Sequence, residues 1–139
     1  MKRQIKHIVL HCTATSQKAT VEAIQRYWRD QLGWKNPGYH YLISPDGTVH
    51  KLQPEELPAN GVAGHNSTSI HVSYIGGIDA NSRPADNRTC RQTTEMYYLV
   101  VDLLARYPDA KLLGHRDFPG VKKDCPSFNA KEWFKNYII

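Results

Sequence analysis

The stretch LGHRDFPGVKKDCPSF, residues 113–128, carries the most informative pattern in the chain. It places a histidine and a cysteine in a loop that is punctuated by glycine and proline and follows a short apolar run. A second stretch, IVLHCTAT at residues 8–15, ends a strand-like run with another histidine. If the two loops meet in the fold, His11, His115 and Cys125 supply three nitrogen and sulfur ligands. A catalytic zinc site uses that number and leaves a fourth position open for water.

Length and composition indicate one globular domain. The chain has 139 residues, enough for a single core, and shows no low-complexity tract. Its net charge of +5 favours an approach to polyanions such as nucleic acid, anionic lipid or the acidic polymers of a bacterial envelope. Because the basic residues are scattered, we do not expect nucleic acid as a partner. We also expect the protein to be a monomer. Three cysteines are too few for a disulfide framework and are expected to be free thiols or ligands.

The amino-terminal apolar run is short. Only Ile8 to Leu10 are continuously apolar after the basic start, which is too little for a secretory signal or a membrane span. We therefore expect synthesis in the cytoplasm without a signal peptide, and no stable membrane insertion.

Strand and helix signals alternate along the chain. Helices are predicted from Thr20 to about residue 32, from Thr89 to Pro108 and after Asn129, each starting at a capping residue. Strands are predicted at residues 5–11, 39–43, 48–52, 70–75 and 110–113, with a hairpin turn at 44–47 and a long surface loop at 53–69. The pattern predicts a single α/β domain, residues 1–139, with a central mixed sheet flanked by helices.

The spacing of the candidate ligands argues against two other kinds of site. Nine residues separate His115 from Cys125, and the chain has no paired C-x-x-C motif, which disfavours a closed structural zinc site. A cysteine hydrolase dyad of His11 and Cys12 is disfavoured because adjacent strand residues point to opposite faces. Spacing alone leaves open whether the candidate ligands bind a metal or are a surface histidine and a buried thiol.

Two other side chains acquire a role only beside a metal. Lys123 lies two residues before Cys125, where its ammonium could stabilise an oxyanion formed from a substrate carbonyl. Tyr39 precedes a predicted strand, and its phenol could hydrogen-bond the same carbonyl or the attacking water. Without a metal, Tyr39 is a core aromatic and Lys123 is a solvated lysine, and for Lys123 this is the better interpretation from sequence alone.

A series of short motifs spans nearly the whole chain. In order they are HCTAT at 11–15, GYH at 38–40, DGTV at 46–49, GHN at 64–66 with SI at 69–70, GGID at 76–79, GHRD at 114–117 and KDCPSF at 123–128. Together they resemble the type-2 N-acetylmuramoyl-L-alanine amidase family, which includes zinc-dependent phage lysozymes and the peptidoglycan recognition proteins. No single motif is decisive, but the ordered set is highly specific.

The resemblance implies a zinc enzyme that acts on peptidoglycan. It implies zinc held by His11, His115 and Cys125, with Tyr39 and Lys123 as the catalytic pair. The implied reaction is hydrolysis of the amide between the lactyl group of N-acetylmuramic acid and L-alanine, in phage or prophage lysis or after specialised export. Retention of the thiolate ligand and the catalytic pair favours an active amidase over a non-catalytic peptidoglycan-binding recognition module, which is the alternative.

The resemblance also suggests how substrate is held and where this chain departs from the family. Trp34, His65 and Asn66 are candidate substrate contacts in the walls of a groove. Where the family usually has glycine after the Ser-Ile pair, this chain has His71, and it has Gly61 and the two residues after it where many relatives carry a further histidine. We expect both departures to leave the metal ligands intact and to affect the shape of the groove.

Overall fold

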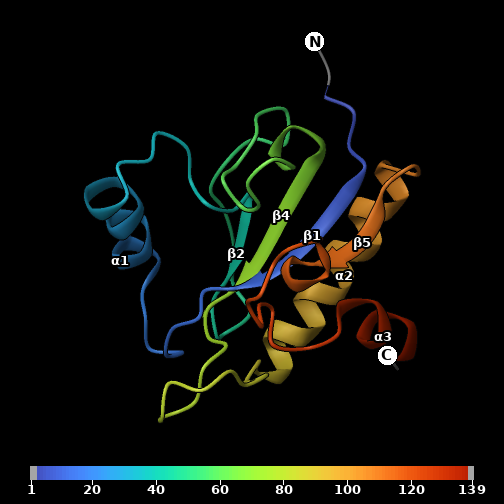
Figure 1. The fold of residues 1–139 in the computed structure, drawn as a ribbon. Coiled ribbons are helices and arrows are strands. Elements are labelled where there is room, and N and C mark those ends of the chain that lie inside the picture. The colour runs from blue at the N-terminus through green and yellow to red at the C-terminus, as the bar shows by residue number, and fades with distance from the viewer. Residues whose placement is uncertain (1–2, 138–139) are drawn as a thin grey trace.

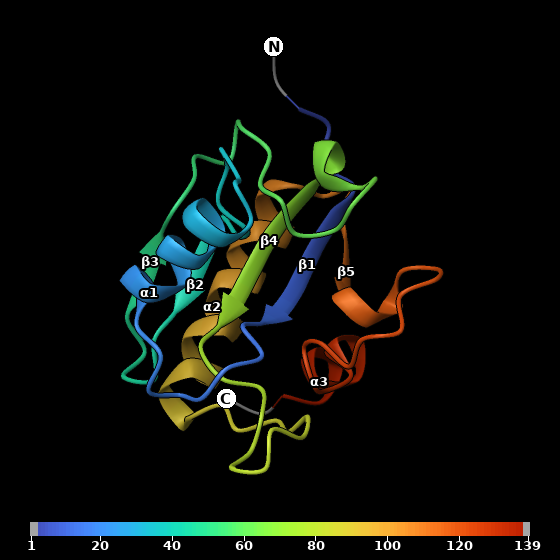
Figure 2. The ribbon, with the colours of Figure 1, turned by 60° about the vertical axis from the view of Figure 1, so that its left-hand side comes forward.

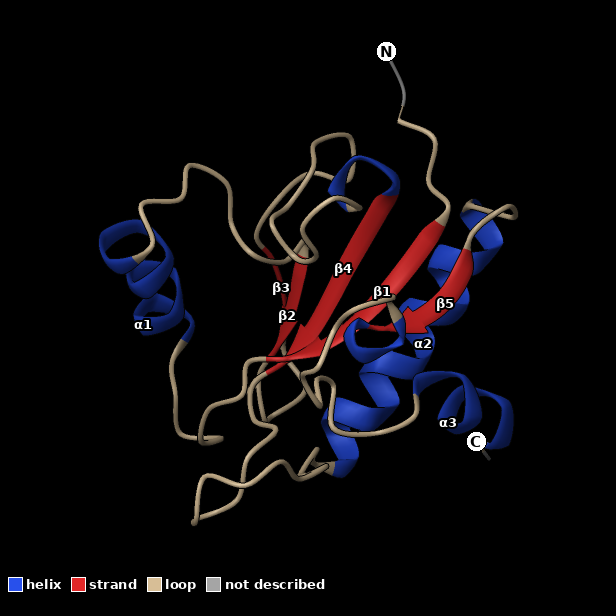
Figure 3. Ribbon diagram, viewed as in Figure 1, coloured by secondary structure: helices blue, strands red, loops and turns tan. Residues whose placement is uncertain are grey.

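Five strands form one mixed sheet in the order β3-β2-β4-β1-β5 (Figures 1 and 3). The computed structural model describes residues 3–137. Strand β3 is antiparallel to β2, and the other neighbouring strands are parallel. The strands are β1 (His7–Cys12), β2 (Tyr41–Ile43), β3 (Val49–Lys51), β4 (Ser69–Tyr74) and β5 (Lys111–Gly114). The predicted α/β fold with a hairpin inside a mixed sheet is confirmed.

The central strands β1 and β4 are buried along nearly their whole length because both faces of the sheet are covered. On β1, Ile8 and Leu10 belong to the larger core cluster on one face, whereas Val9 packs with Val62 and Phe118 on the other.

Helix α2 (Cys90–Arg106) supports the first of these faces and crosses behind the sheet in Figure 2. Its predicted capping box is present, with the hydroxyl of Thr89 and the amide of Gln92 hydrogen-bonded to each other's backbone N–H. The residues that it buries against the sheet are spaced at helical intervals: Met96, Val100 and Leu103. Helix α3 (Ala130–Asn136) starts at Asn129 as predicted and packs beside β5.

Helix α1 (Val21–Arg26) covers the opposite face near β2. Thr20 caps it as predicted, but the helix widens into a π-helical turn, η1 (Tyr27–Gln31), in which the Leu32 N–H donates to the Tyr27 carbonyl. The π-helical turn therefore replaces the last α-helical turn predicted for this segment. None of the helices within residues 3–137 is long and apolar enough to span a membrane.

The segment at 53–69 is more buried than the predicted surface loop. Glu55 is buried and accepts hydrogen bonds from Arg106, at 2.7 and 2.9 Å, and from the hydroxyls of Tyr107 and Tyr41. The Arg106 hydrogen bonds, with those of the two tyrosines, lower the pKa of Glu55 to about 2 although burial opposes the shift. This long-range contact pins the loop to the end of α2, and the loop closes with a 3₁₀ turn, η2 (Asn66–Thr68).

Candidate active site

The two histidines meet because their strands are parallel neighbours. The register of β1 and β5 pairs Leu10 with Gly114, so the next residues, His11 and His115, emerge side by side at the carboxyl ends of the strands. Their ring centroids lie 4.9 Å apart. His11 is fully buried, whereas His115, which opens the short 3₁₀ turn η3 (His115–Asp117), is half-buried.

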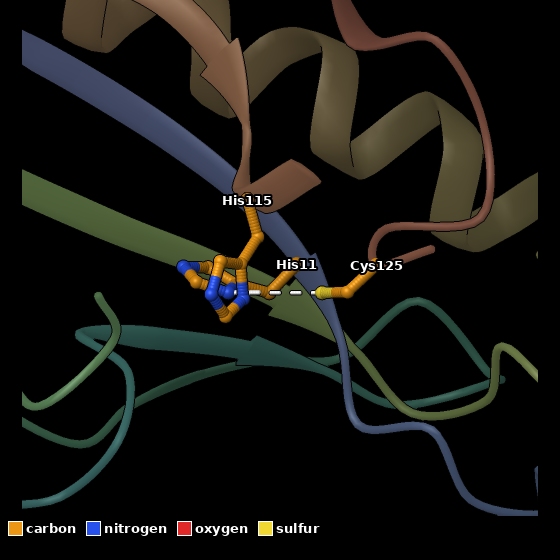
Figure 4. A group of neighbouring side chains, drawn as sticks. All are labelled: His11, His115 and Cys125. Atoms are coloured by element: carbon orange, nitrogen blue, oxygen red, sulfur yellow. Dashed lines mark hydrogen bonds between the residues drawn. The ribbon is translucent and has the colours of Figure 1, made fainter. Parts of the chain in front are cut away.

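Cys125 is carried to the histidines by the loop after η3. Its sulfur accepts a hydrogen bond from the Cys12 N–H at 3.2 Å and lies 3.8 Å from Nδ1 of His11 (Figure 4). The close return of the chain needs a glycine at position 114, since a Cβ there would lie only 2.8 Å from Cδ of Pro126. The structure therefore brings together three side chains from the two stretches of sequence.

The three side chains fit a zinc ion. Their ligand atoms, in His11, His115 and Cys125, all lie within 4.8 Å of one another. A tetrahedral zinc ion with bonds of about 2.0–2.3 Å separates its ligand atoms by roughly 3.3–3.8 Å, so a small adjustment suffices. Two imidazoles and one thiol are borderline and soft ligands that suit zinc better than magnesium or calcium. A cavity of about 190 Å³ is lined by all three and gives access to the cluster.

Burial prepares the imidazoles as ligands. It lowers the pKa of His11, which neighbouring His71 and His115 lower further, and burial likewise lowers the pKa of His115. Both rings are thus neutral near neutral pH, with a lone pair available. A hydrogen bond with Cys12 and burial raise the pKa of the Cys125 thiol in the metal-free protein. A bound divalent cation would instead favour the thiolate form of Cys125, since a thiol that coordinates a metal ion is deprotonated.

Tyr39 lies against the cluster. Its ring centroid is 5.1 Å from that of His11, and its hydroxyl donates to the Cys12 carbonyl at 3.2 Å. The edge of its ring packs on Trp28, which fixes the phenol at the wall of the cavity. Burial and the nearby Cys125 raise the pKa of Tyr39, so the phenol keeps its proton and can donate it in a hydrogen bond.

Lys123 is exposed and stands where three hollows adjoin. With Trp34 it lines the small cavity at the cluster and two larger depressions of about 680 and 700 Å³. We call these three connected hollows the groove. Trp34 stacks on Trp28 with ring centroids 6.4 Å apart and planes inclined by 22°, which holds an indole face in the groove wall.

The other two candidate substrate contacts lie in different places. Asn66 lines the groove beside His115, but its side-chain oxygen is occupied by the Val62 N–H at 2.8 Å and by Nε2 of His71 at 2.9 Å. His65 packs on Phe118, with ring centroids 4.6 Å apart, near the start of β1. The structure therefore brings Trp34 and Asn66 to the groove walls but places His65 apart from the cluster.

His71 has a different position from the one expected. It is fully buried, and its Nδ1 lies 2.9 Å from Nε2 of His11, beneath the cluster instead of in the groove. The sequence indicates only the face on which His71 lies, because SIHVSY alternates polar and apolar residues and so places its side chain on one face with Ser69 and Ser73. The register that pairs His71 with Val9, two residues before His11, becomes known only from the structure.

Comparisons with known proteins identify the family of this chain. The family profile described as N-acetylmuramoyl-L-alanine amidase matches residues 1–128. The endolysin of Klebsiella phage KP32 is 36% identical over 140 residues, covering 99% of this chain and 91% of its own length. The endolysin of Escherichia phage T7 is 38% identical over 135 residues, covering 95% of this chain and 87% of its own length. The Ph2119 endolysin structure, from a Thermus scotoductus bacteriophage, superposes with a TM-score of 0.82 at 25% identity, covering 96% of this chain and 84% of that one.

The profile covers every residue of the cluster and of the groove described above. The chain therefore belongs to the N-acetylmuramoyl-L-alanine amidase family and is a hydrolase of that class.

Proposed function

We propose that this chain is a zinc-dependent endolysin that hydrolyses the amide between the lactyl group of N-acetylmuramic acid and L-alanine in peptidoglycan, and that residues 1–139 form the amidase domain. The observation that carries the proposal is the convergence of His11, His115 and Cys125 within 4.8 Å at the floor of an open groove. Its relatives from Klebsiella phage KP32 and Escherichia phage T7 are named endolysins, which supports the same setting for this chain.

Zinc, when bound by the three ligands, supplies a Lewis acid that polarises a carbonyl and acidifies a water molecule. The remaining chemistry belongs to the chain. Lys123 extends its ammonium into the groove beside His115, where it stabilises negative charge on the carbonyl oxygen of the substrate. When substrate is bound, the neutral phenol of Tyr39 turns its single proton from the Cys12 carbonyl to the same oxygen. These two groups stabilise the negative charge that develops in the tetrahedral intermediate.

The groove suits an extended sugar–peptide substrate. Trp34 presents an indole face, and Asn66 presents the NH₂ group that its internal hydrogen bonds leave free. The net charge of +5 favours the approach of a monomeric protein to the anionic polymers of the cell wall.

The proposal is tested by incubating the purified protein with peptidoglycan and counting new L-alanine amino termini. We expect release that a chelator abolishes and added zinc restores. Lys123→Ala should lower the rate by about 10²–10³-fold, as for removal of an oxyanion donor. Lys131, an exposed lysine on α3 that lines none of the three hollows, serves as the matched control, and Lys131→Ala should retain most of the activity.

An absence of new amino termini in a sample that holds stoichiometric zinc would refute the enzymatic role. If that sample bound muropeptides equally well with and without metal, the recognition-module alternative would replace the proposal.

A further inference from the structure

Two buried histidines beneath the cluster and the half-buried Asn66 form a hydrogen-bonded row that ends at a ligand. The row runs from Asn66 through His71 to His11, with 2.9 Å between Oδ1 of Asn66 and Nε2 of His71 and 2.9 Å between Nδ1 of His71 and Nε2 of His11. The proton positions along the row follow from its starting point.

The orientation of the Asn66 side-chain amide is fixed by a hydrogen bond from the backbone. The Val62 N–H can only donate, and it lies 2.8 Å from the side-chain oxygen of Asn66. This contact establishes that the oxygen, and not the NH₂ group, of Asn66 faces His71. An amide oxygen can only accept, so Nε2 of His71 must carry a proton.

The proton positions on His71 determine which nitrogen of His11 carries a proton. A neutral His71 that is protonated at Nε2 has a lone pair at Nδ1, which accepts the Nε2 proton of His11. His11 is thereby left with its lone pair at Nδ1. That nitrogen is the one 3.8 Å from the sulfur of Cys125, on the side where the ligand atoms converge.

The middle of the row is held rigidly. The backbone N–H of His71 donates to Nδ1 of His40 at 3.0 Å, and the two rings stack with centroids 5.9 Å apart and planes inclined by 17°. On the other side the ring of His71 fills space that only a glycine leaves free, because a Cβ at Gly61 would lie 2.2 Å from Nδ1. The two positions at which the sequence departs from its family pattern, Gly61 and His71, therefore pack against each other.

We propose that His71 and Asn66 are positioning residues that hold His11 in the tautomer and ring orientation required to bind zinc through Nδ1. The inference rests on the proposed function for the identity of the metal. Partners that orient a ligating histidine in this way are typically worth 10–100-fold in metal affinity.

The test compares His71→Leu, which has no acceptor, with His71→Asn, whose amide oxygen can replace Nδ1 as the acceptor for His11. Zinc dissociation constants are measured by competition with a chelating dye, on samples shown to be folded by their denaturation midpoints. We expect His71→Leu to bind zinc 10–100-fold more weakly and His71→Asn to recover most of the loss. If the variants at 71 do not fold, Asn66→Leu and Asn66→Asp give the same comparison, since aspartate keeps an acceptor oxygen.

A second readout needs no metal. In the metal-free protein, ¹⁵N NMR should show His11 protonated at Nε2, with a coupling across the hydrogen bond to Nδ1 of His71. A proton on Nδ1 of His11 would overturn the inference. So would a His71→Leu protein that is folded and binds zinc as tightly as the wild type. A wild-type protein that binds no zinc would overturn the proposed function together with this inference.

Discussion

Tyr39 is the clearest case in which one residue's surroundings define its chemistry. Packing between His11 and Trp28 leaves its phenol partly exposed at the cavity wall, and burial holds its pKa above the usual range. The hydroxyl therefore keeps its proton near neutral pH and is a hydrogen-bond donor, and its role does not require ionisation.

Tyr39→Phe should lower kcat about 10²–10³-fold on soluble muropeptide while zinc content stays unchanged, because the variant removes one donor to the developing oxyanion and no ligand. Tyr98→Phe, on the exposed side of α2, is the matched control and should be indistinguishable from the wild type. Full activity in Tyr39→Phe would show that the phenol is only a packing group.

At the residue scale, the predictability of each side chain depends on whether its position follows from local sequence. His11 and His115 were predictable as strand-end residues because apolar runs precede them. The burial of His71 against His11 was not, since it depends on which strands are neighbours and in which register.

At the scale of elements, the turn that contains Gly61 and strand β4 behave as one packed unit. The backbone of Gly61 has an ordinary conformation, so a side chain there meets no dihedral strain, but it meets the ring of His71, which is held at both nitrogens. The obstacle to substitution is therefore steric and local.

Gly61→Ala should destabilise the fold by about 1–3 kcal/mol, the usual cost of overpacking, as measured by denaturant unfolding. The same substitution in a His71→Gly background should cost almost nothing, because the ring is absent. Gly64→Ala is the control, because Gly64 has a φ of +86° and no neighbour near the position of an added Cβ. This substitution should lower the free energy of unfolding by about 1 kcal/mol through backbone strain alone. The loss should therefore be equal in both backgrounds. Additive effects of the changes at 61 and 71 would contradict the packing.

Helix α2 was predictable because its capping box and its apolar stripe are both local patterns. The burial of the loop at 53–69 was not predictable. It depends on Glu55 pairing with Arg106, 51 residues away, and no periodicity in the sequence reports such a contact.

At the scale of the whole molecule, a mixed sheet was predictable from the alternation of elements and the hairpin, whereas the order β3-β2-β4-β1-β5 was not. That order places His11, His40 and His71 together in the interior. Burial lowers the pKa of all three, that of His40 to about 4 with a contribution from Arg3. A group of neutral imidazoles inside the protein makes its stability depend on pH.

The sign of this dependence follows from the direction of the shifts. Below pH 6.5 the unfolded chain binds protons that the folded chain excludes, so stability falls as pH drops towards 4. For His40 alone, the loss between pH 7 and pH 5 is roughly 2 kcal/mol. His40→Asn, which keeps an acceptor for the His71 N–H, should reduce the measured loss by about that amount. Equal losses in the wild type and in His40→Asn would contradict the assignment.

The metal centre is tested most directly by the zinc content of the purified protein beside two cysteine variants. The convergence of His11, His115 and Cys125 predicts about one zinc ion per chain in the wild type and in Cys90→Ala, whose thiol is exposed on α2, and a loss of that zinc in Cys125→Ala. Equal zinc in all three proteins, or none in the wild type, would contradict the account.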